Sequence, residues 1–271
     1  MNIIYNEDCL LTMNRTELQS NIDLVITSPP YNTSRVGASD IWNSRYDTYK
    51  DKLSDQEYIN WTIDVFKGFN DVLKKDGCVL YNMSYSSENT HLMWLVVSEI
   101  IRNTNFTTAD CIIWKKSTAI PNNRSKNKLT RIIEYIFVFV RKKELKTFNS
   151  NKKVISHIEK TGQCNYENVY NFIEAKNNDG SNKLNKATYS TELILKLMDI
   201  YGTKNGLVYD PFMGVGTTAK GALEFGMSYV GSELSKEQIE YANIHLHEVK
   251  IKEKETGNVL EIGVEDDYWT K

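Results

Sequence analysis

The sequence has few of the residues that build metal sites, disulfide frameworks and membrane spans. It contains only 4 Cys, 4 His and 4 Pro in 271 residues. No two cysteines form a C-x-x-C pair and the histidines show no metal-ligand spacing, so we expect no metal, no disulfide framework and a reducing, cytoplasmic location. No run approaches the ~18 apolar residues of a membrane span. The first residues lack a basic stretch followed by an apolar one, so we expect no signal peptide and no membrane partner.

The residues that are present have an ordinary globular balance but an uneven charge. The chain is 41% hydrophobic and 25% charged, which excludes the disordered and fibrous classes. Its net charge is −2, yet residues 115–160 carry thirteen basic and three acidic side chains, a local charge of +10 against −12 elsewhere. A basic face on an acidic body can attract a polyanion. The alternative interpretation is a solvated lysine-rich surface.

Short apolar runs alternate along the chain with helical patterns. We expect strands at Ile22–Thr27, Gly77–Met83, Thr108–Lys115, Ile132–Val140, Leu207–Asp210 and Ser228–Glu233. Helices are expected after a capping box at Ser54, at His91–Arg102, at Thr191–Tyr201, and after a second capping box at Ser235. This alternation predicts an α/β fold with a mostly parallel sheet covered on both faces. The segments Asn32–Leu53 and Lys143–Ala187 fit neither pattern and are predicted to be long loops, either functional or mobile.

A first motif, Ser28-Pro29-Pro30-Tyr31, follows the expected strand at residues 22–27. Two prolines remove backbone donors and leave carbonyl oxygens without local partners. At the carboxyl end of a parallel strand these acceptors lie where α/β sheets bind ligands. Acceptors beside an aromatic ring suit a planar base that bears an exocyclic amine. The alternative is a tight turn with a packed tyrosine.

A second motif runs from Asp210 to Thr218 and connects a strand to a helix. Its Gly214-x-Gly216-x-x-Ala219 part matches the dinucleotide fingerprint, which alone is a weak signal. An acidic Asp210 fits poorly beside a pyrophosphate and well beside the cationic end of S-adenosylmethionine. Glu233 ends the next strand, where it can bind ribose hydroxyls as in dinucleotide folds. The alternative is a glycine-rich turn without a ligand.

Together the two motifs resemble those of the DNA amino-methyltransferases, which methylate N4 of cytosine or N6 of adenine. The resemblance covers essentially the whole chain, and the catalytic motif precedes the cofactor motif by about 180 residues, as in the permuted β-type of this family. It implies a Rossmann-like methyltransferase fold and S-adenosyl-L-methionine as the cofactor. None of the four cysteines follows a proline, unlike the nucleophile of the C5-cytosine enzymes.

The resemblance also implies roles for individual residues. Ser28 and the Pro29 carbonyl would accept hydrogen bonds from the target amine, with Pro30 and Tyr31 completing the motif and the Tyr31 ring stacking on a flipped base. The cofactor-binding residues it implies are Asp8, Cys9, Asp210, Phe212, Gly214, Gly216, Thr217, Thr218 and Glu233. Thr188 and Ser190 are further candidates, although residues 186–191 lack the prolines that the family often has there. Residues 73–77, Trp114-Lys115 and Glu134 resemble inner motifs.

The order of the motifs divides the chain into three parts. Residues 1–142 would form the catalytic half, residues 143–187 a basic target-recognition insert, and residues 188–271 the cofactor-binding half of one domain. The expected partner is double-stranded DNA, and a cognate restriction endonuclease and a homodimer are alternatives that the resemblance leaves open. The candidate DNA-binding residues are Arg124, Lys126, Lys128, Arg131, Lys152 and Lys153.

Three function classes are consistent with these motifs. The first is a sequence-specific DNA methyltransferase, with N4 of cytosine favoured because Ser-Pro-Pro-Tyr is commonest among those enzymes and N6 of adenine as the alternative. The second is a nicotinamide-dependent oxidoreductase that uses the Gly214 loop. The third is a DNA-binding subunit without activity. RNA or protein glutamine are alternative substrates, which the long basic segment disfavours.

Overall fold

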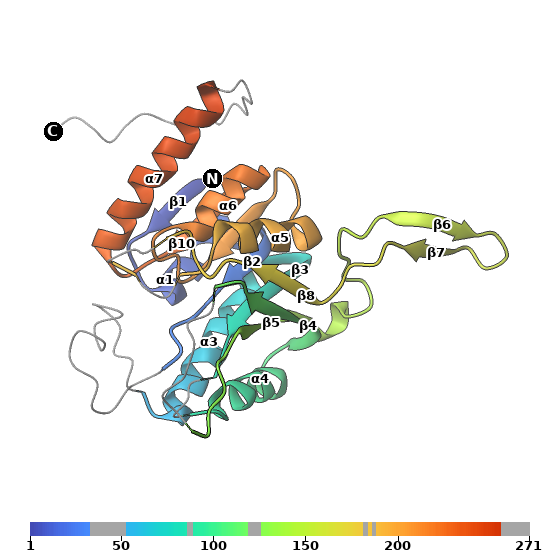
Figure 1. Cartoon of the computed structure of the whole chain (residues 1–271), viewed down its shortest axis with the longest axis horizontal. Coiled ribbons are helices and arrows are strands. Elements are labelled where there is room, and N and C mark those ends of the chain that lie inside the picture. The colour runs from blue at the N-terminus through green and yellow to red at the C-terminus, as the bar shows by residue number, and fades with distance from the viewer. Residues whose placement is uncertain (33–52, 86–88, 119–125, 181–183, 186–187, 256–271) are drawn as a thin grey trace.

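The computed structural model describes residues 1–32, 53–85, 89–118, 126–180, 184–185 and 188–255. In these residues the main sheet has the strand order β1-β10-β9-β2-β3-β5-β4-β8 (Figure 1). The strands are β1 Asn2–Tyr5, β2 Ile22–Thr27, β3 Leu73–Met83, β4 Phe106–Lys116, β5 Ile133–Arg141, β8 Phe172–Ala175, β9 Leu207–Asp210 and β10 Ser228–Ser232. Strand β5 runs antiparallel to β3 and β4, and the other neighbouring pairs are parallel. The predicted mostly parallel sheet is confirmed.

Helices cover both faces of this sheet. Helices α1 (Cys9–Met13), α3 (Asp55–Val72) and α4 (Leu92–Asn103) pack on one face, and α5 (Thr191–Tyr201), α6 (Thr217–Phe225) and α7 (Lys236–Glu255) on the other. Successive residues of β2 enter different cores: Val25 packs with the first set of helices, and Leu24 and Ile26 with the second. Because both faces are buried, the central strands are continuous apolar runs in the sequence. Short 3₁₀ helices lie at Thr16–Leu18 (η1) and Lys142–Glu144 (η2).

The two predicted capping boxes have different outcomes. At α3 the box is confirmed, since Ser54 and Glu57 each accept from the other's backbone N–H. At α7 the Ser235 hydroxyl accepts from the Gln238 N–H at 3.4 Å. The second half of that box is wrong, because the Ser235 N–H donates to Glu233 at 2.9 Å and the Gln238 side chain accepts from Asn185 instead. This exchange ties the start of α7 to the end of β10.

The prediction of a long irregular loop at residues 143–187 is also wrong. Strands β6 (Val154–Ile158) and β7 (Gln163–Tyr166) form an antiparallel hairpin that extends away from the body (Figure 1). Strand β8 joins the main sheet parallel to β4. The hairpin strands are exposed on both sides, so their sequence lacks the alternation that marks a half-buried strand. The short β1 and α1 were missed as well, and residues 33–52 of the other predicted loop lie outside the described residues.

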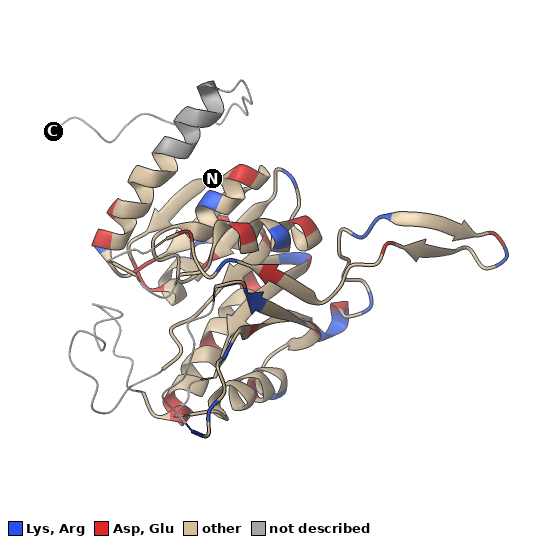
Figure 2. Cartoon of the chain, in the orientation of Figure 1, with Lys and Arg blue, Asp and Glu red and all other residues tan. Residues whose placement is uncertain are grey.

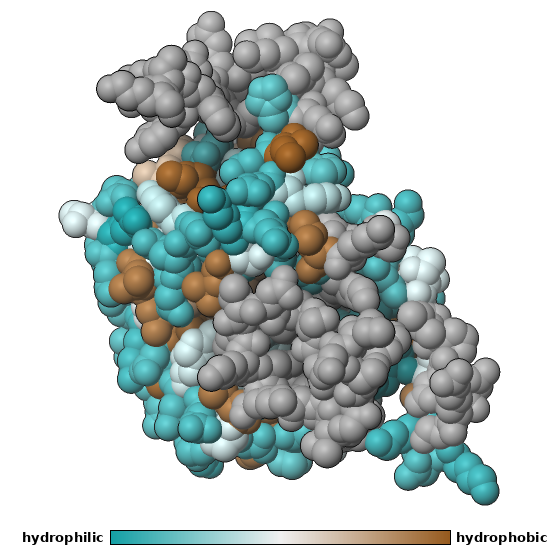
Figure 3. Space-filling model, turned by 90° about the vertical axis from the view of Figure 1, so that its left-hand side faces the viewer, coloured by the Kyte–Doolittle hydropathy of each residue, from teal (hydrophilic) through white to brown (hydrophobic). Residues whose placement is uncertain are grey.

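On the coloured part of the face seen in Figure 3, hydrophilic residues prevail and hydrophobic side chains form smaller separate areas between them. Scattered exposed apolar residues are normal for a surface in contact with water. Within the described residues, no helix has both the length and the apolar character to cross a membrane.

Candidate active site

A cavity lies where β2, β9 and β10 end, as expected for ligand sites of open α/β sheets. It comprises about 930 Å³ of space, part of it open to solvent. Nine predicted residues line it: Asp8, Cys9, Ser28, Pro30, Thr188, Phe212, Gly214, Thr217 and Glu233. The sequence motifs missed Glu7, Trp61, Asn185, Tyr189, Pro211, Met213, Val215, Leu234 and Gln238 in its wall.

The glycine loop bends tightly between β9 and α6. Gly214 and Gly216 have φ values of +55° and +86°, a left-handed conformation that L side chains rarely adopt. A Cβ atom on Gly216 would also meet the Ala242 Cβ of α7 at 2.9 Å. Gly216 was predicted to bind the cofactor, but it packs against α7 and does not line the cavity. Gly214 and Thr217 do line the cavity.

Glu233 follows β10 and connects the glycine loop to the start of α7 through its two carboxylate oxygens. One oxygen accepts from the Gly214 N–H at 2.8 Å and the other from the Ser235 N–H at 2.9 Å. Burial raises the pKa of this carboxyl group, and the backbone donors oppose that rise. Each oxygen has the capacity to accept a further hydrogen bond, and Glu233 lines the cavity. Its position agrees with the predicted binding of two ribose hydroxyls.

Asp210 lies beneath the cavity rather than in its wall, which differs from the prediction that it faces the cationic end of the cofactor. Its side chain is 1% exposed. It accepts from the Thr27, Tyr189 and Thr218 hydroxyls at 2.8, 2.8 and 2.6 Å, and from the Phe212 N–H at 3.0 Å. Burial raises the pKa of Asp210, and these donors counter the effect. The carboxylate therefore connects β2, β9, α6 and the segment before α5.

Two further predicted cofactor residues are structural in their contacts. Thr218 bonds to Asp210, and its hydroxyl is also within hydrogen-bond distance of Tyr189. Ser190 is the N-cap of α5, where its side chain accepts from the Leu193 N–H and donates to the Lys176 carbonyl. Both side chains are fully buried and neither lines the cavity. The neighbouring Thr188 does line it.

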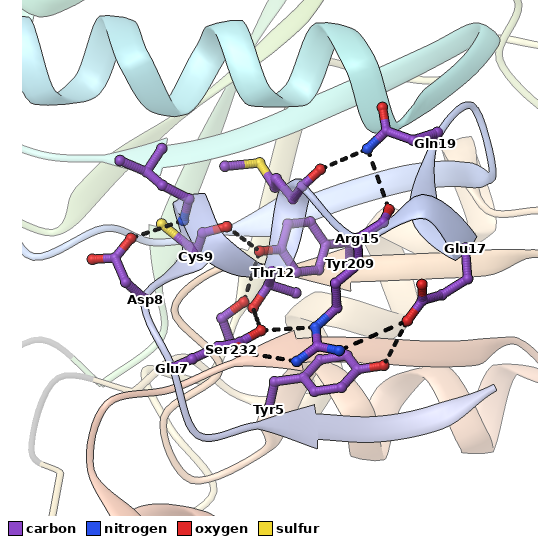
Figure 4. Close-up of polar contacts among 12 residues, drawn as sticks. Tyr5, Glu7, Asp8, Cys9, Thr12, Arg15, Glu17, Gln19, Tyr209 and Ser232 are labelled. Carbon is purple, nitrogen blue, oxygen red and sulfur yellow. Dashed lines mark hydrogen bonds and ion pairs between the residues drawn. The ribbon is translucent and has the colours of Figure 1, made fainter.

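The N-terminal element that carries Asp8 and Cys9 is held by a polar network (Figure 4). Asp8 caps α1 by accepting from the Leu10 N–H at 2.8 Å, and Glu7 forms a two-bond ion pair with Arg15 at 2.9 and 3.0 Å. Burial raises the pKa of the Cys9 thiol, so this group stays neutral. Asp8 and Cys9 therefore contribute a polar and an apolar group to the cavity wall.

Aromatic rings form an apolar part of the cavity wall. Trp61 of α3 and Phe212 of the second motif lie 5.4 Å apart between ring centroids, tilted by 41°. Both line the cavity. Phe212 was predicted from its motif, whereas Trp61 sits at helical spacing among core residues and gave no separate signal. Such a wall suits the flat face of an adenine ring.

The residues of the first motif come together at the end of β2. Ser28 and Tyr31 have their hydroxyl oxygens 3.0 Å apart. The Pro30 carbonyl, predicted to lack a local partner, accepts from the Tyr58 hydroxyl at 2.7 Å. Pro29 is buried and does not itself line the cavity, whereas Ser28 and Pro30 do. The cofactor-type cavity therefore opens directly onto the predicted catalytic motif.

Comparison with known proteins agrees with this arrangement. A family model described as DNA methylase matches residues 22–244. The chain belongs to the DNA methylase family. The curated type II methyltransferase M.BglII from Bacillus subtilis is 25% identical, over 89% of this chain and 68% of its own length. The DNA adenine methyltransferase YhdJ of Escherichia coli is 24% identical, over 94% and 89%. A solved structure described as the cytosine-N4-specific PvuII DNA methyltransferase superposes with a TM-score of 0.68 at 16% identity, covering 95% of this chain and 93% of that one.

Membership of the DNA methylases confirms the predicted enzyme class and the Rossmann-like methyltransferase fold. It also decides against a nicotinamide-dependent oxidoreductase. S-adenosyl-L-methionine is the methyl donor of this class, and the cavity fits it. Glu233 offers carboxylate oxygens for a ribose, and Trp61 and Phe212 offer an apolar wall for an adenine.

The predicted DNA-binding residues of this methylase lie in two separate places (Figure 2). Lys126, Lys128 and Arg131 are exposed on the connection from β4 to β5, where the Arg131 guanidinium also contacts the Tyr85 carbonyl. Lys152 and Lys153 are exposed at the base of the β6–β7 hairpin. Arg124 lies outside the described residues.

Several basic side chains of residues 115–160 form contacts with other groups of the protein itself. Arg141 is 6% exposed, and its guanidinium donates to three backbone carbonyls and to Glu144. Lys115 and Lys116 pair with Glu174 and Glu134. The count of basic residues in the sequence therefore overstates the charge that residues 115–160 present to a polyanion.

Proposed function

We propose that this methylase transfers the methyl group of S-adenosyl-L-methionine to the exocyclic amine of a base flipped out of duplex DNA, with N4 of cytosine as the target. One observation carries the proposal: Ser28 and Pro30 line the same cavity as Gly214 and Glu233. An acceptor for the amine, Ser28, and the groups for the cofactor thus line one cavity. Methyl donor and target nitrogen would be oriented there without a covalent enzyme intermediate.

The chemistry needs a nucleophilic nitrogen and a shielded site. The amine would donate hydrogen bonds to the Ser28 oxygen and the Pro29 carbonyl, which directs its lone pair at the methyl carbon. A nitrogen–carbon bond forms as the carbon–sulfur bond breaks, and the electron pair stays on the neutral sulfur of the product. The nitrogen then carries a positive charge and releases one proton to return to neutral. Tyr31 would support the flipped base by stacking.

The choice of cytosine rests on the first residue of the motif. Ser28 offers a neutral hydroxyl where adenine enzymes of the resembling family typically have an aspartate. The PvuII enzyme is described as cytosine-N4-specific and the YhdJ relative as an adenine methyltransferase. N6 of adenine therefore stays as the second candidate.

Nucleoside mass spectrometry tests this choice. Plasmid DNA free of prior methylation is incubated with the purified protein and S-adenosyl-L-methionine, digested to nucleosides and analysed. We expect N4-methylcytidine in its deoxy form as the dominant new species. Dominant N6-methyldeoxyadenosine would contradict the choice of base and leave the methyl transfer to an amine intact.

Binding of DNA is proposed to use both basic groups, with residues 143–187 contributing to target recognition through the hairpin. Lys126→Gln/Lys128→Gln and Lys152→Gln/Lys153→Gln remove two charges each. If each lysine contacts a phosphate, each double substitution should make the negative slope of log affinity against log salt concentration less steep by ~2. Fluorescence anisotropy with a labelled duplex at several salt concentrations measures the slope.

Lys67→Gln is the matched control, because Lys67 is an exposed lysine that pairs with Asp64 on α3. We expect it to leave the slope unchanged. An unaltered slope in both double variants would assign DNA binding to another surface. A cognate restriction endonuclease and a homodimer stay as predictions from the family resemblance.

A further inference from the structure

A polar network lies behind the catalytic motif and connects four strands of the sheet. Glu134 lies near the N-terminal end of β5, and Asn82 lies near the carboxyl end of β3. Because the two strands are antiparallel, both residues lie at the same edge of the sheet as Ser28 and Tyr31. The Asn82 amide nitrogen lies 2.9 Å from the Tyr31 hydroxyl and 2.9 Å from a Glu134 oxygen. The same Glu134 oxygen lies 3.2 Å from the Tyr31 hydroxyl. The Ser28 and Tyr31 oxygens are 3.0 Å apart.

The orientation of the Asn82 amide follows from its neighbours. Asn82 is 5% exposed, and the reversed amide would place its oxygen against the Glu134 carboxylate. An amide nitrogen has two hydrogens, which the two 2.9 Å contacts use. The Ser28 oxygen, at 3.3 Å from the same nitrogen, is its most distant acceptor. Asn82 therefore donates to Tyr31 and Glu134.

The remaining hydroxyl hydrogens can then be assigned. The Tyr31 hydroxyl has one hydrogen, and the Glu134 carboxylate is the strongest acceptor within its reach. If Tyr31 donates to Glu134, its oxygen accepts from Asn82 and has one lone pair left for the Ser28 hydroxyl. Ser28 then donates to Tyr31. Its own oxygen is left as an acceptor.

We propose that Glu134 acts through Tyr31 to fix Ser28 as a hydrogen-bond acceptor for the target amine. This inference rests on the proposed methyl transfer and extends it by a positioning residue. In the chain Ser28–Tyr31–Glu134 each hydroxyl donates towards the carboxylate, which increases the electron density on the Ser28 oxygen. A serine thereby approaches the acceptor strength of the aspartate found at this position in other enzymes of the resembling family. Tyr31 has a role through its hydroxyl that is separate from stacking.

The second carboxylate oxygen of Glu134 is held by a basic side chain of β4. Its side chain is 14% exposed and its other oxygen forms an ion pair with Lys116, whose side chain is 22% exposed. The Lys116 ammonium lies 5.1 Å from the centroid of the Trp114 ring, which is itself fixed by a bond from its indole N–H to the Ala175 carbonyl. One carboxylate oxygen of Glu134 thus contacts Asn82 and Tyr31, and the other contacts Lys116.

A double-mutant cycle tests the relay. Tyr31→Phe keeps the ring and removes the hydroxyl, and Glu134→Gln keeps the shape and removes the charge. The methyl-transfer rate is measured in single turnovers at saturating S-adenosyl-L-methionine and duplex DNA, with dissociation constants measured separately. We expect each variant to lower the rate about tenfold with little change in either dissociation constant. The double variant should also be about tenfold slower, because both changes break the same chain.

The controls separate this inference from the proposed function. Glu174→Gln breaks the neighbouring exposed pair with Lys115, 2.9 Å long, and should leave the saturated rate unchanged. Absence of DNA methylation by the wild-type protein would contradict the proposed function itself. With an active wild type, a normal rate for Tyr31→Phe would overturn the relay. A double variant about a hundredfold slower would also overturn it, because multiplying effects mean independent contributions.

Discussion

Replacing Asp210 with alanine is expected to destabilise the fold by ~3–5 kcal/mol, because it leaves four donors without their buried acceptor. These donors belong to Thr27, Phe212, Tyr189 and Thr218, which come from β2, the glycine loop, the segment before α5, and α6. The carboxylate therefore holds together the elements that shape the cavity floor. Urea unfolding followed by circular dichroism measures the loss, provided that the slope with denaturant is unchanged.

Asp210→Asn and Asp64→Ala serve as comparisons. The asparagine keeps one acceptor oxygen and should cost less than the alanine, and Asp64 lies in an exposed pair where removal should cost less than ~0.5 kcal/mol. Burial raises the folded-state pKa of Asp210 above its ordinary 3.8. At a pH between the unfolded-state and the folded-state pKa of Asp210, the folded protein binds more protons than the unfolded chain. The wild type should therefore lose stability relative to Asp210→Asn as the pH rises through this range. Equal stability of Asp210→Ala and the wild type would refute this structural role.

Replacing Glu233 with alanine is expected to weaken binding of S-adenosyl-L-methionine about 100-fold, which corresponds to ~3 kcal/mol. Two ribose hydroxyls would lose charge-assisted hydrogen bonds, each worth ~1.5–3 kcal/mol. The Gly214 and Ser235 amides would also lose the acceptor that fixes the loop. Isothermal titration calorimetry on the purified variants measures the dissociation constant.

Two matched variants sharpen this result. Glu233→Gln keeps one carbonyl oxygen and should fall between the wild type and the alanine variant. Glu240→Gln changes an exposed carboxylate on α7 that pairs only loosely with Lys236 at 3.8 Å, and should bind the cofactor normally. A dissociation constant for Glu233→Ala within twofold of the wild-type value would place the ribose elsewhere.

The central architecture could be predicted from the sequence because buried parallel strands are continuous apolar runs. Strands β2 and β9 and helix α5 have the predicted bounds. The hairpin β6–β7 could not be predicted, because strands exposed on both sides have no alternation. Strand β8 contributes four residues to the sheet, and its place beside β4 depends on a contact distant in sequence.

The candidate site shows the same division between local and long-range information. Motifs correctly placed Ser28, Gly214 and Glu233 at the cavity, because these residues lie where a strand turns into a loop. Asp210 is in the same motif, yet the fold places it beneath the cavity, surrounded by donors from four elements. Sequence spacing cannot show which side of a turn a carboxylate takes. The partners of Glu134 likewise come from three other strands or strand ends.

The most direct test of the central claim follows the methyl group itself. The protein is incubated with duplex DNA and S-adenosyl-L-methionine that carries a trideuterated methyl group, and the digested nucleosides are fragmented by mass spectrometry. The account predicts the intact trideuteromethyl group on an exocyclic amine. It also predicts that a Ser28→Ala variant binds the cofactor normally but transfers the methyl group at least tenfold more slowly. Label on C5 of cytosine, no label in DNA, or full transfer by Ser28→Ala would contradict it.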